Sequence, residues 1–171
     1  MPDGSIANKT QAGVTTLDAL IIGAGFSGLY QLLSLRDKLG MKAKVVEAGD
    51  GVGGTWYWNR YPGARCDSES HSYSYYFDKE LLEEWQWSER YPGHAEVVRY
   101  LNYAADKLDL KRDIHFNSKV LSAHYSQTEN RWIVKTEDGR EFVCTYLITA
   151  VGCLSSTNIP KFPGHESFEG E

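Results

Sequence analysis

Cysteine is scarce in this chain, and its few cysteines form no recognisable site. Cys66, Cys144 and Cys153 are the only three among 171 residues. Their spacing matches no metal-ligand pattern, and an odd number cannot pair completely as disulfides. We therefore predict no metal site and expect reduced thiols, as in a cytoplasmic protein. The 5 histidines are scattered along the sequence, and none is assigned to catalysis.

Long apolar runs and an excess of positive charge are also lacking. No run approaches the roughly 20 apolar residues of a transmembrane helix. Residues 1–16 are polar and lack the apolar segment of a secretory signal. The net charge of −5 argues against nucleic acid or an anionic membrane surface as a partner. We expect residues 1–16 to be a disordered tail and residues 17–171 to form one folded unit with a substantial core.

Glycine, in contrast, is concentrated where it has a specific use. Residues 17–22 (LDALII) are almost all apolar, as in a parallel strand covered on both faces. Gly23 then allows a tight turn, and Gly25 lets the backbone approach a pyrophosphate. Gly28 allows a following helix to pack closely on the strand. This arrangement is typical of a dinucleotide-binding turn.

The segments after the glycines fit the same unit. A helix is predicted over residues 26–39, and Gly40 is expected to end it. Its buried side is expected to carry Leu29, Leu32, Leu35 and Leu39. A second strand, residues 42–47, ends in Glu47, 19 residues after Gly28. A carboxylate at this spacing accepts hydrogen bonds from ribose hydroxyls and repels the 2′-phosphate of NADP. The pattern therefore indicates FAD or NAD, without separating the two.

The next segment is far more specific. It reads Gly51-Val-Gly-Gly-Thr-Trp56 and continues as Tyr57-Trp-Asn-Arg-Tyr-Pro-Gly-Ala-Arg-Cys-Asp67. With Gly23-Ala-Gly-Phe-Ser-Gly28, Glu47 and Ala150-Val-Gly-Cys-Leu-Ser155, it resembles the flavoprotein Baeyer–Villiger monooxygenases, within the class B flavin monooxygenases. The resemblance covers nearly all of the chain after residue 16. It implies the N-terminal, FAD-binding part of an enzyme that uses NADPH and O₂. Such an enzyme converts a ketone to an ester or lactone through a C4a-peroxyflavin.

The resemblance also implies which residues contact the cofactors. The pyrophosphate of FAD would lie against the first glycine turn, the adenosine beyond it, and the flavin against the second glycine segment. In chain order, the implied FAD-binding residues are Gly23, Gly25, Ser27, Gly28, Glu47 (adenosine ribose), Gly54, Thr55, Trp56, Asp67, Tyr73 and Val120 (adenine, through its backbone). Arg65 is expected beside the nicotinamide of NADPH.

Asp67 is the one catalytic residue that the resemblance implies here. It would lie near the flavin and orient a catalytic arginine. A buried carboxylate is costly without a cation, so we expect an arginine or lysine to reach it from elsewhere in the protein. The alternative is that Asp67 pairs with Arg65 and only fastens the loop. Trp56, Trp58 and Tyr61 have a similar alternative, since large rings in a long loop usually form its local core.

The remaining pattern predicts an α/β fold. We expect a Rossmann-like FAD-binding domain with a parallel sheet and an antiparallel β-meander inserted before the last parallel strand. The aromatic-rich residues 56–91 are expected to pack over the cofactor and line part of a substrate pocket. The further predicted elements are helices over residues 78–90 and 94–108, and strands over residues 114–116, 119–126, 131–137 and 141–150.

The last residues bear on how complete the site is. Phe168-Glu-Gly170 resembles the start of the family's fingerprint, but the histidine and tryptophan–proline pair of that fingerprint do not follow. A second GxGxxG turn for NADPH and the catalytic arginine are also missing. We therefore expect the N-terminal part of a larger, two-dinucleotide flavoprotein, inactive alone. Its expected partners are the remainder of the same enzyme or a second polypeptide, a small ketone and O₂.

Three alternatives stay open. A related class B enzyme oxygenates nitrogen or sulfur, or hydroxylates an amine, with the same FAD and NADPH. A disulfide reductase requires a redox cysteine pair after the first helix, whereas Cys66 stands alone. The third alternative is a non-catalytic flavin-binding fragment that needs a partner chain.

Overall fold

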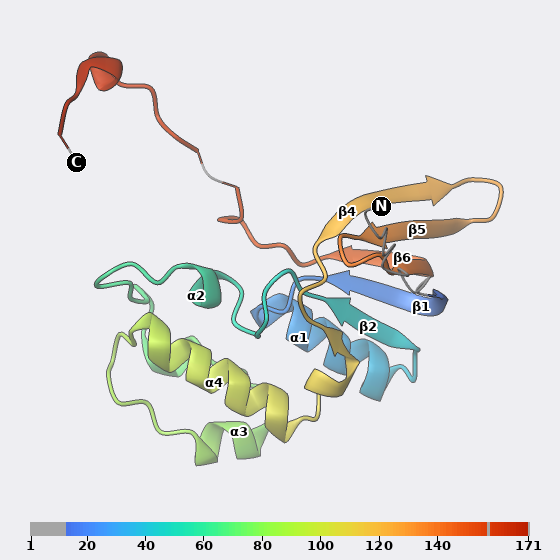
Figure 1. Cartoon of the computed structure of the whole chain (residues 1–171). Coiled ribbons are helices and arrows are strands. Elements are labelled where there is room, and N and C mark those ends of the chain that lie inside the picture. The colour runs from blue at the N-terminus through green and yellow to red at the C-terminus, as the bar shows by residue number, and fades with distance from the viewer. Residues whose placement is uncertain (1–12, 157, 171) are drawn as a thin grey trace, which may run out of the picture.

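A single six-stranded sheet forms the centre of the molecule. The computed structural model describes residues 13–156 and 158–170, and its strands lie in the order β3-β2-β1-β6-β5-β4 (Figure 1). The four strands β1, β2, β3 and β6 run parallel, whereas β4 and β5 are antiparallel to their neighbours. The strands are β1 (Val14–Ile22), β2 (Ala43–Val46), β3 (Ile114–His115), β4 (Val120–Ser126), β5 (Arg131–Thr136) and β6 (Glu141–Thr149). The predicted Rossmann-like α/β class is confirmed.

Strand β6 belongs to both parts of the sheet. It pairs in parallel with β1 over the whole of β1, from Val14↔Glu141 to Ile22↔Thr149. Its other edge pairs antiparallel with β5. The meander β4-β5-β6 is therefore continuous with the parallel sheet, and its third strand is the last parallel strand itself, not a strand inserted before it. A nine-residue strand can do this because both of its backbone edges carry hydrogen-bonding groups.

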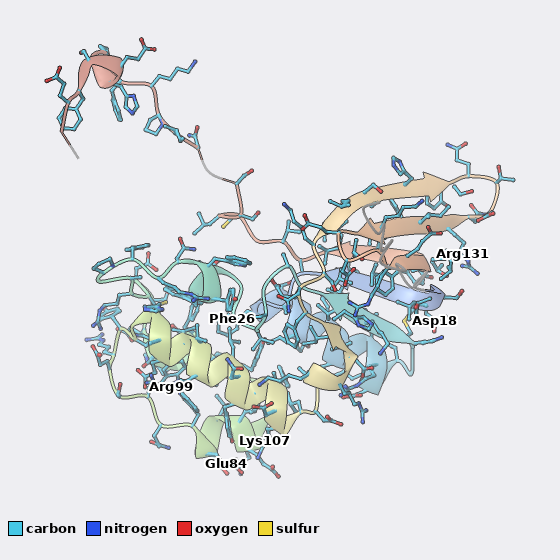
Figure 2. The ribbon with its side chains drawn as sticks, viewed as in Figure 1. Asp18, Phe26, Glu84, Arg99, Lys107 and Arg131 are labelled. Atoms are coloured by element: carbon cyan, nitrogen blue, oxygen red, sulfur yellow. The ribbon has the colours of Figure 1, made fainter. Side chains whose placement is uncertain are left out.

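The two long helices lie on one side of the parallel strands. Helix α1 (Phe26–Leu33) packs on β1 and β2, and α4 (His94–Lys107) lies beyond it (Figure 1). Buried residues of β1, α1 and α4 form one core. Figure 2 shows Phe26, the first residue of α1, between the two helices. The shorter helical segments are η1 (Ser34–Lys38), α2 (Thr55–Trp58), η2 (Ser70–Ser72), α3 (Lys79–Glu84), η3 (Lys111–Asp113) and η4 (His165–Ser167).

Several predicted boundaries were wrong. Strand β1 begins at Val14, so residues 14–16 of the expected tail are strand, because β6 supplies them with a pairing partner. Residues 1–12 lie outside the described part of the chain. The first helix reaches Lys38, but its last five residues form a π-helix. This wider turn changes the direction of the following side chains, and Leu39 is 67% exposed instead of buried. The helix predicted over residues 78–90 ends at Glu84.

The aromatic-rich segment contributes to the core. Tyr75, Trp85 and Trp87 pack around Tyr100 of α4, with ring centroids 5.0 to 6.1 Å from that of Tyr100. These three rings therefore support α4 as part of the core. Apolar rings far apart in sequence gather here because the exposed alternative costs hydrophobic free energy.

Two further properties concern the described residues as a whole. All three cysteines are free thiols, with Cys66 and Cys144 buried and Cys153 exposed. Within residues 13–156 and 158–170, no helix has both the length and the apolar character needed to cross a membrane.

Candidate functional site

The candidate site lies at the edge of the sheet where the parallel strands end. Gly23 follows β1, Glu47 follows β2 and Ala150 follows β6. Backbone hydrogen bonds hold these three strand ends together: Gly23 N donates to Val46 O at 2.9 Å, and Ala150 N donates to Ile22 O at 2.9 Å. In open α/β sheets, ligands bind outside this carboxyl edge.

The first glycine turn has a steric requirement for glycine at two of its three positions. Gly23 has a φ of +104°, and a Cβ built on it would lie 2.6 Å from Ala150 O. A Cβ on Gly28 would lie only 1.8 Å from Gly23 O. The predicted tight turn and the predicted close packing of the helix on the strand are therefore confirmed.

Gly25 is close to a second glycine, Gly54. A Cβ on Gly25 would lie 3.3 Å from Gly54 Cα, and a Cβ on Gly54 would lie 2.9 Å from Gly25 Cα. Gly53 N also donates to Ala24 O at 3.1 Å. Two turns about thirty residues apart thus pack against each other backbone to backbone. This contact places Thr55, the first residue of α2, next to the first turn.

The N-terminus of α1 points toward this edge and carries unsatisfied donors. Its N-cap is Gly25, no side chain caps it, and its first turn contains no acidic residue. Backbone N–H groups in a first helical turn have no partner within the helix, and the helix dipole adds partial positive charge there. Ser27 is exposed in that turn. These groups suit a phosphate or pyrophosphate.

Glu47 provides a fixed carboxylate beside the turn. The residue is 4% exposed. Its Oε2 accepts a hydrogen bond from Ala24 N at 2.7 Å, and its Oε1 accepts one from Gly49 N at 2.8 Å. Each carboxylate oxygen can accept a further hydrogen bond. The predicted ribose-binding residue and the predicted pyrophosphate-binding turn are therefore in direct contact.

Val120 lies near Glu47 through the backbone of the preceding residues. Ser118 N donates to Glu47 O at 2.8 Å, and Asn117 N donates to Gly49 O at 2.9 Å. Val120 itself is the first residue of β4 and packs against the smaller core that contains Val46.

Trp56 and Tyr73 form a pair beside the glycine turns, where Tyr73 meets the first residue of α1. Trp56 Nε1 donates to Tyr73 Oη at 3.1 Å, and the Tyr73 ring meets that of Phe26 edge to face at 4.9 Å. Burial raises the pKa of Tyr73, and the nearby Cys66 and Asp67 act in the same direction. Asp67 is thus near enough to Tyr73 for its charge to act on the Tyr73 hydroxyl group.

The expectation of a buried Asp67 carboxylate was wrong, and the alternative in which Asp67 pairs with Arg65 does not hold. Asp67 is exposed, and among the ion pairs and side-chain hydrogen bonds of the described residues it has none. Arg65 does not pair with it; Arg65 Nη1 contacts a Glu89 oxygen and the Tyr91 carbonyl oxygen instead. The cause is strand-like alternation, since residues 64 and 66 are buried and residues 65 and 67 are exposed next to the bridge between Arg65 and Gly93.

Sequence reasoning missed Tyr57. Trp58 and Tyr61 are 58% and 62% exposed, so the alternative that they form a local loop core does not hold for these two rings. The Tyr57 ring takes that place: a Cβ on Gly49 would lie 2.7 Å from it, and Tyr57 Oη donates to Asp50 Oδ1 at 2.6 Å. Glycines at alternate positions 49, 51 and 53 were the available signal.

The site offers no cluster for a metal ion. In the part of the chain that the structure describes, no group of three or more His, Cys, Asp or Glu residues is arranged to hold one. The groups present are backbone amides, one carboxylate and aromatic rings, which fit an organic dinucleotide.

Comparison with known proteins extends this result. A family model described as an NAD(P)-binding Rossmann-like domain matches residues 21–84. A Baeyer–Villiger monooxygenase from Pseudooceanicola batsensis is 47% identical over 153 residues, which are 90% of this chain and 28% of that protein. The phenazine N-monooxygenase PhzNO1 of Lysobacter antibioticus is 44% identical over 157 residues, 92% of this chain and 29% of that protein.

A solved structure agrees. The structure of oxidized steroid monooxygenase bound to NADP has a TM-score of 0.81 and 47% identity, over 89% of this chain and 29% of that one. The chain thus spans about 30% of the length of the proteins it matches. The resemblance predicted from the sequence is confirmed: the chain is similar to the Baeyer–Villiger monooxygenases, whose N-terminal part it matches.

Proposed function

We propose that the protein carrying this chain is an FAD- and NADPH-dependent Baeyer–Villiger monooxygenase that converts small ketones to esters or lactones with O₂. This chain supplies the first part of its FAD-binding domain. The observation that carries the proposal is the contact between the uncapped glycine turn and the Glu47 carboxylate, 2.7 Å from Ala24 N.

The residues present fit FAD. Gly23, Gly25, Ser27 and Gly28 would hold its pyrophosphate with helix amides, as the uncapped start of α1 allows. Glu47 would accept hydrogen bonds from the adenosine ribose. A 2′-phosphate would meet this carboxylate, so the turn favours FAD over NADPH, which we assign to another part of the protein.

The flavin end is assigned to the second group of residues. Gly54, Thr55 and Trp56 would hold the ribityl chain and ring, and Tyr73 would fix Trp56 through its hydroxyl group. When bound, FAD supplies the redox chemistry that activates O₂. Val120 would contact the adenine through its backbone, on the far side of Glu47.

Asp67 and Arg65 form the part of the site that depends on other segments. The exposed Asp67 carboxylate is free to pair with a cation from the rest of the protein, and we assign that role to the catalytic arginine. Contact between Arg65 and the nicotinamide requires Arg65 to leave Glu89, an ion pair between groups that are each about half exposed. Such a pair contributes only about 1 kcal/mol or less. We also propose that the protein is located in the cytoplasm, consistent with its three free thiols.

The test uses the protein that carries these residues. Its absorbance spectrum reports bound flavin, and NADPH oxidation is then measured with a panel of ketones. Mass spectrometry of the products completes the assay. Bound FAD with ketone-dependent ester or lactone formation supports the proposal. A purified protein that neither contains flavin nor binds added FAD overturns it.

Oxygenation of nitrogen is the second candidate, because the chain is 44% identical to a phenazine N-monooxygenase. Both activities use the same cofactors, so only the products separate them. An N-oxide formed from an aromatic amine panel, with no ester from any ketone, would favour the second candidate.

A further inference from the structure

The turn between β5 and β6 is tied to the segment that leads into β4. Thr136 Oγ1 and Arg140 Nη1 both donate to the Asp138 carboxylate. Arg140 Nη1 also donates to Ser118 Oγ at 2.7 Å, and Ser118 Oγ lies 2.8 Å from Asp138 Oδ2. Glu137 N donates to Lys119 O at 2.8 Å. Side chains and backbone together join this turn to residues 118 and 119.

Two hydroxyl groups of this network are buried, so losing a hydrogen-bond partner is costly. Ser118 is 1% exposed and Thr136 is 3% exposed. A buried hydroxyl that loses its partner leaves an unsatisfied polar group, which costs about 1–3 kcal/mol. Burial alone would raise the pKa of Asp138, but the hydrogen bonds from Thr136 and Ser118 and the nearby Arg140 hold it below its ordinary value. The carboxylate is therefore charged at neutral pH and fixed in place.

The network reaches the candidate site through the backbone of Ser118. Ser118 N donates to Glu47 O at 2.8 Å, and the preceding Asn117 N donates to Gly49 O at 2.9 Å. The two carbonyl groups belong to Glu47 and Gly49. The same two residues form the hydrogen bond from Gly49 N to Glu47 Oε1. Ser118 thus contacts the main chain of the residue that carries the carboxylate.

We propose that Ser118, Asp138 and Arg140, here called the adenosine clasp, are positioning residues for the Glu47 carboxylate. They set how well the protein recognises the adenosine ribose of its dinucleotide. The inference rests on the proposed FAD site and deepens it. Within the clasp, Ser118 contacts Glu47 through its backbone N–H group. The side chains of the three clasp residues are not assigned any contact with the cofactor.

The test measures recognition of the ribose hydroxyl itself. FAD and its 2′-deoxyadenosine analogue are titrated into the flavin-free form of the protein that carries these residues, and Kd is measured by quenching of flavin fluorescence. The variants are Asp138→Ala, Asp138→Asn and Ser118→Ala. Glu129→Ala is the matched control, because Glu129 is an exposed acid in the other turn of the meander.

The expected result is a loss of discrimination. Asp138→Ala and Ser118→Ala weaken FAD binding roughly 3- to 10-fold, the equivalent of one hydrogen bond, while binding of the deoxy analogue changes less. The ratio of the Kd for the deoxy analogue to the Kd for FAD therefore falls, whereas Glu129→Ala leaves this ratio unchanged. In a Glu47→Gln background, Asp138→Ala should not lower the ratio further. Asp138→Asn keeps a hydrogen-bond acceptor and should retain part of the discrimination between FAD and its deoxy analogue.

The inference is overturned by an unchanged Kd ratio in all three clasp variants. The ratio is unchanged when neither Kd changes, and also when both rise by the same factor, which indicates general destabilisation. If Asp138→Ala does not fold, Asp138→Asn and Ser118→Ala decide the question on the same ratio. Failure of the unaltered protein to bind FAD overturns the proposed function itself, so the two failures are distinguishable.

Discussion

Gly28→Ala tests whether the fold requires the close approach of α1 to β1. The added Cβ would lie 1.8 Å from Gly23 O, whereas ordinary contacts begin at about 3.4 Å. Neither atom belongs to a flexible side chain, so α1 must withdraw from the strand by more than 1 Å. Overpacking of this kind typically costs about 1–3 kcal/mol.

Withdrawal of the helix adds a second cost. Leu29 and Leu32, which are fully buried in the core beneath α1, lose part of their dispersion contacts. A gap of 0.5–1 Å forfeits about a quarter to a half of such a contact. The better helix propensity of alanine offsets only about 1 kcal/mol. We therefore expect Gly28→Ala to lower the free energy of unfolding by about 3 kcal/mol or more, a large share of the typical 5–15 kcal/mol.

Two other glycines serve as matched controls. Gly13→Ala meets no atom within 4 Å, and Gly25, with a φ of −85°, would bring its Cβ to 3.3 Å from Gly54 Cα. Both variants should lose less than about 1 kcal/mol. Urea unfolding followed by tryptophan fluorescence measures all three. A Gly28→Ala variant within about 0.5 kcal/mol of the unaltered protein, a loss ordinary for surface substitutions, would refute the steric reasoning.

Three further predictions concern single side chains. Tyr73→Phe removes the acceptor of Trp56 Nε1 and should cost about 1 kcal/mol in urea unfolding; no change would mean that water replaces the hydroxyl. Burial raises the pKa of Tyr75, so its contribution to stability is present below the unfolded pKa of about 10 and is lost as the pH rises above it; thermal unfolding should show a smaller alkaline loss in Tyr75→Phe than in the unaltered protein. Asp67→Ala should slow flavin reduction or oxygenation far more than it weakens FAD binding, and normal turnover in stopped-flow assays would remove Asp67 from the mechanism.

The glycine turn and Glu47 could be predicted because their requirements are local. A Cβ on Gly23 or Gly28 meets backbone within the same strand–turn–helix unit or its neighbouring strand. The position of Glu47 follows from the length of one helix and one strand, which fixes the spacing. The long helix over residues 94–107 was equally local, since its apolar period can be read directly.

The features that were predicted wrongly depend on contacts distant in sequence. Residues 14–16 are strand only because β6, more than 120 residues later, pairs with them. The exposure of Leu39 follows from a π-helical turn for which the sequence carries no clear signal. Asp67 is exposed because its short extended segment bridges to Gly93. Secondary-structure propensity and hydrophobic period depend only on neighbours in sequence. Strand pairing and side-chain exposure at these positions depend on segments that are distant in sequence or on local helix geometry.

The two ends of the proposed FAD site differ in how completely this chain builds them. At the adenosine and pyrophosphate end, Glu47 is held by two amides, and Gly25 and Gly54 hold the two turns against each other. Binding there requires little reordering, which favours affinity. At the flavin end, Asp67, Trp58 and Tyr61 are exposed. It follows that FAD affinity should respond chiefly to residues of this chain, whereas the rate of oxygenation should respond to whichever segment covers Asp67.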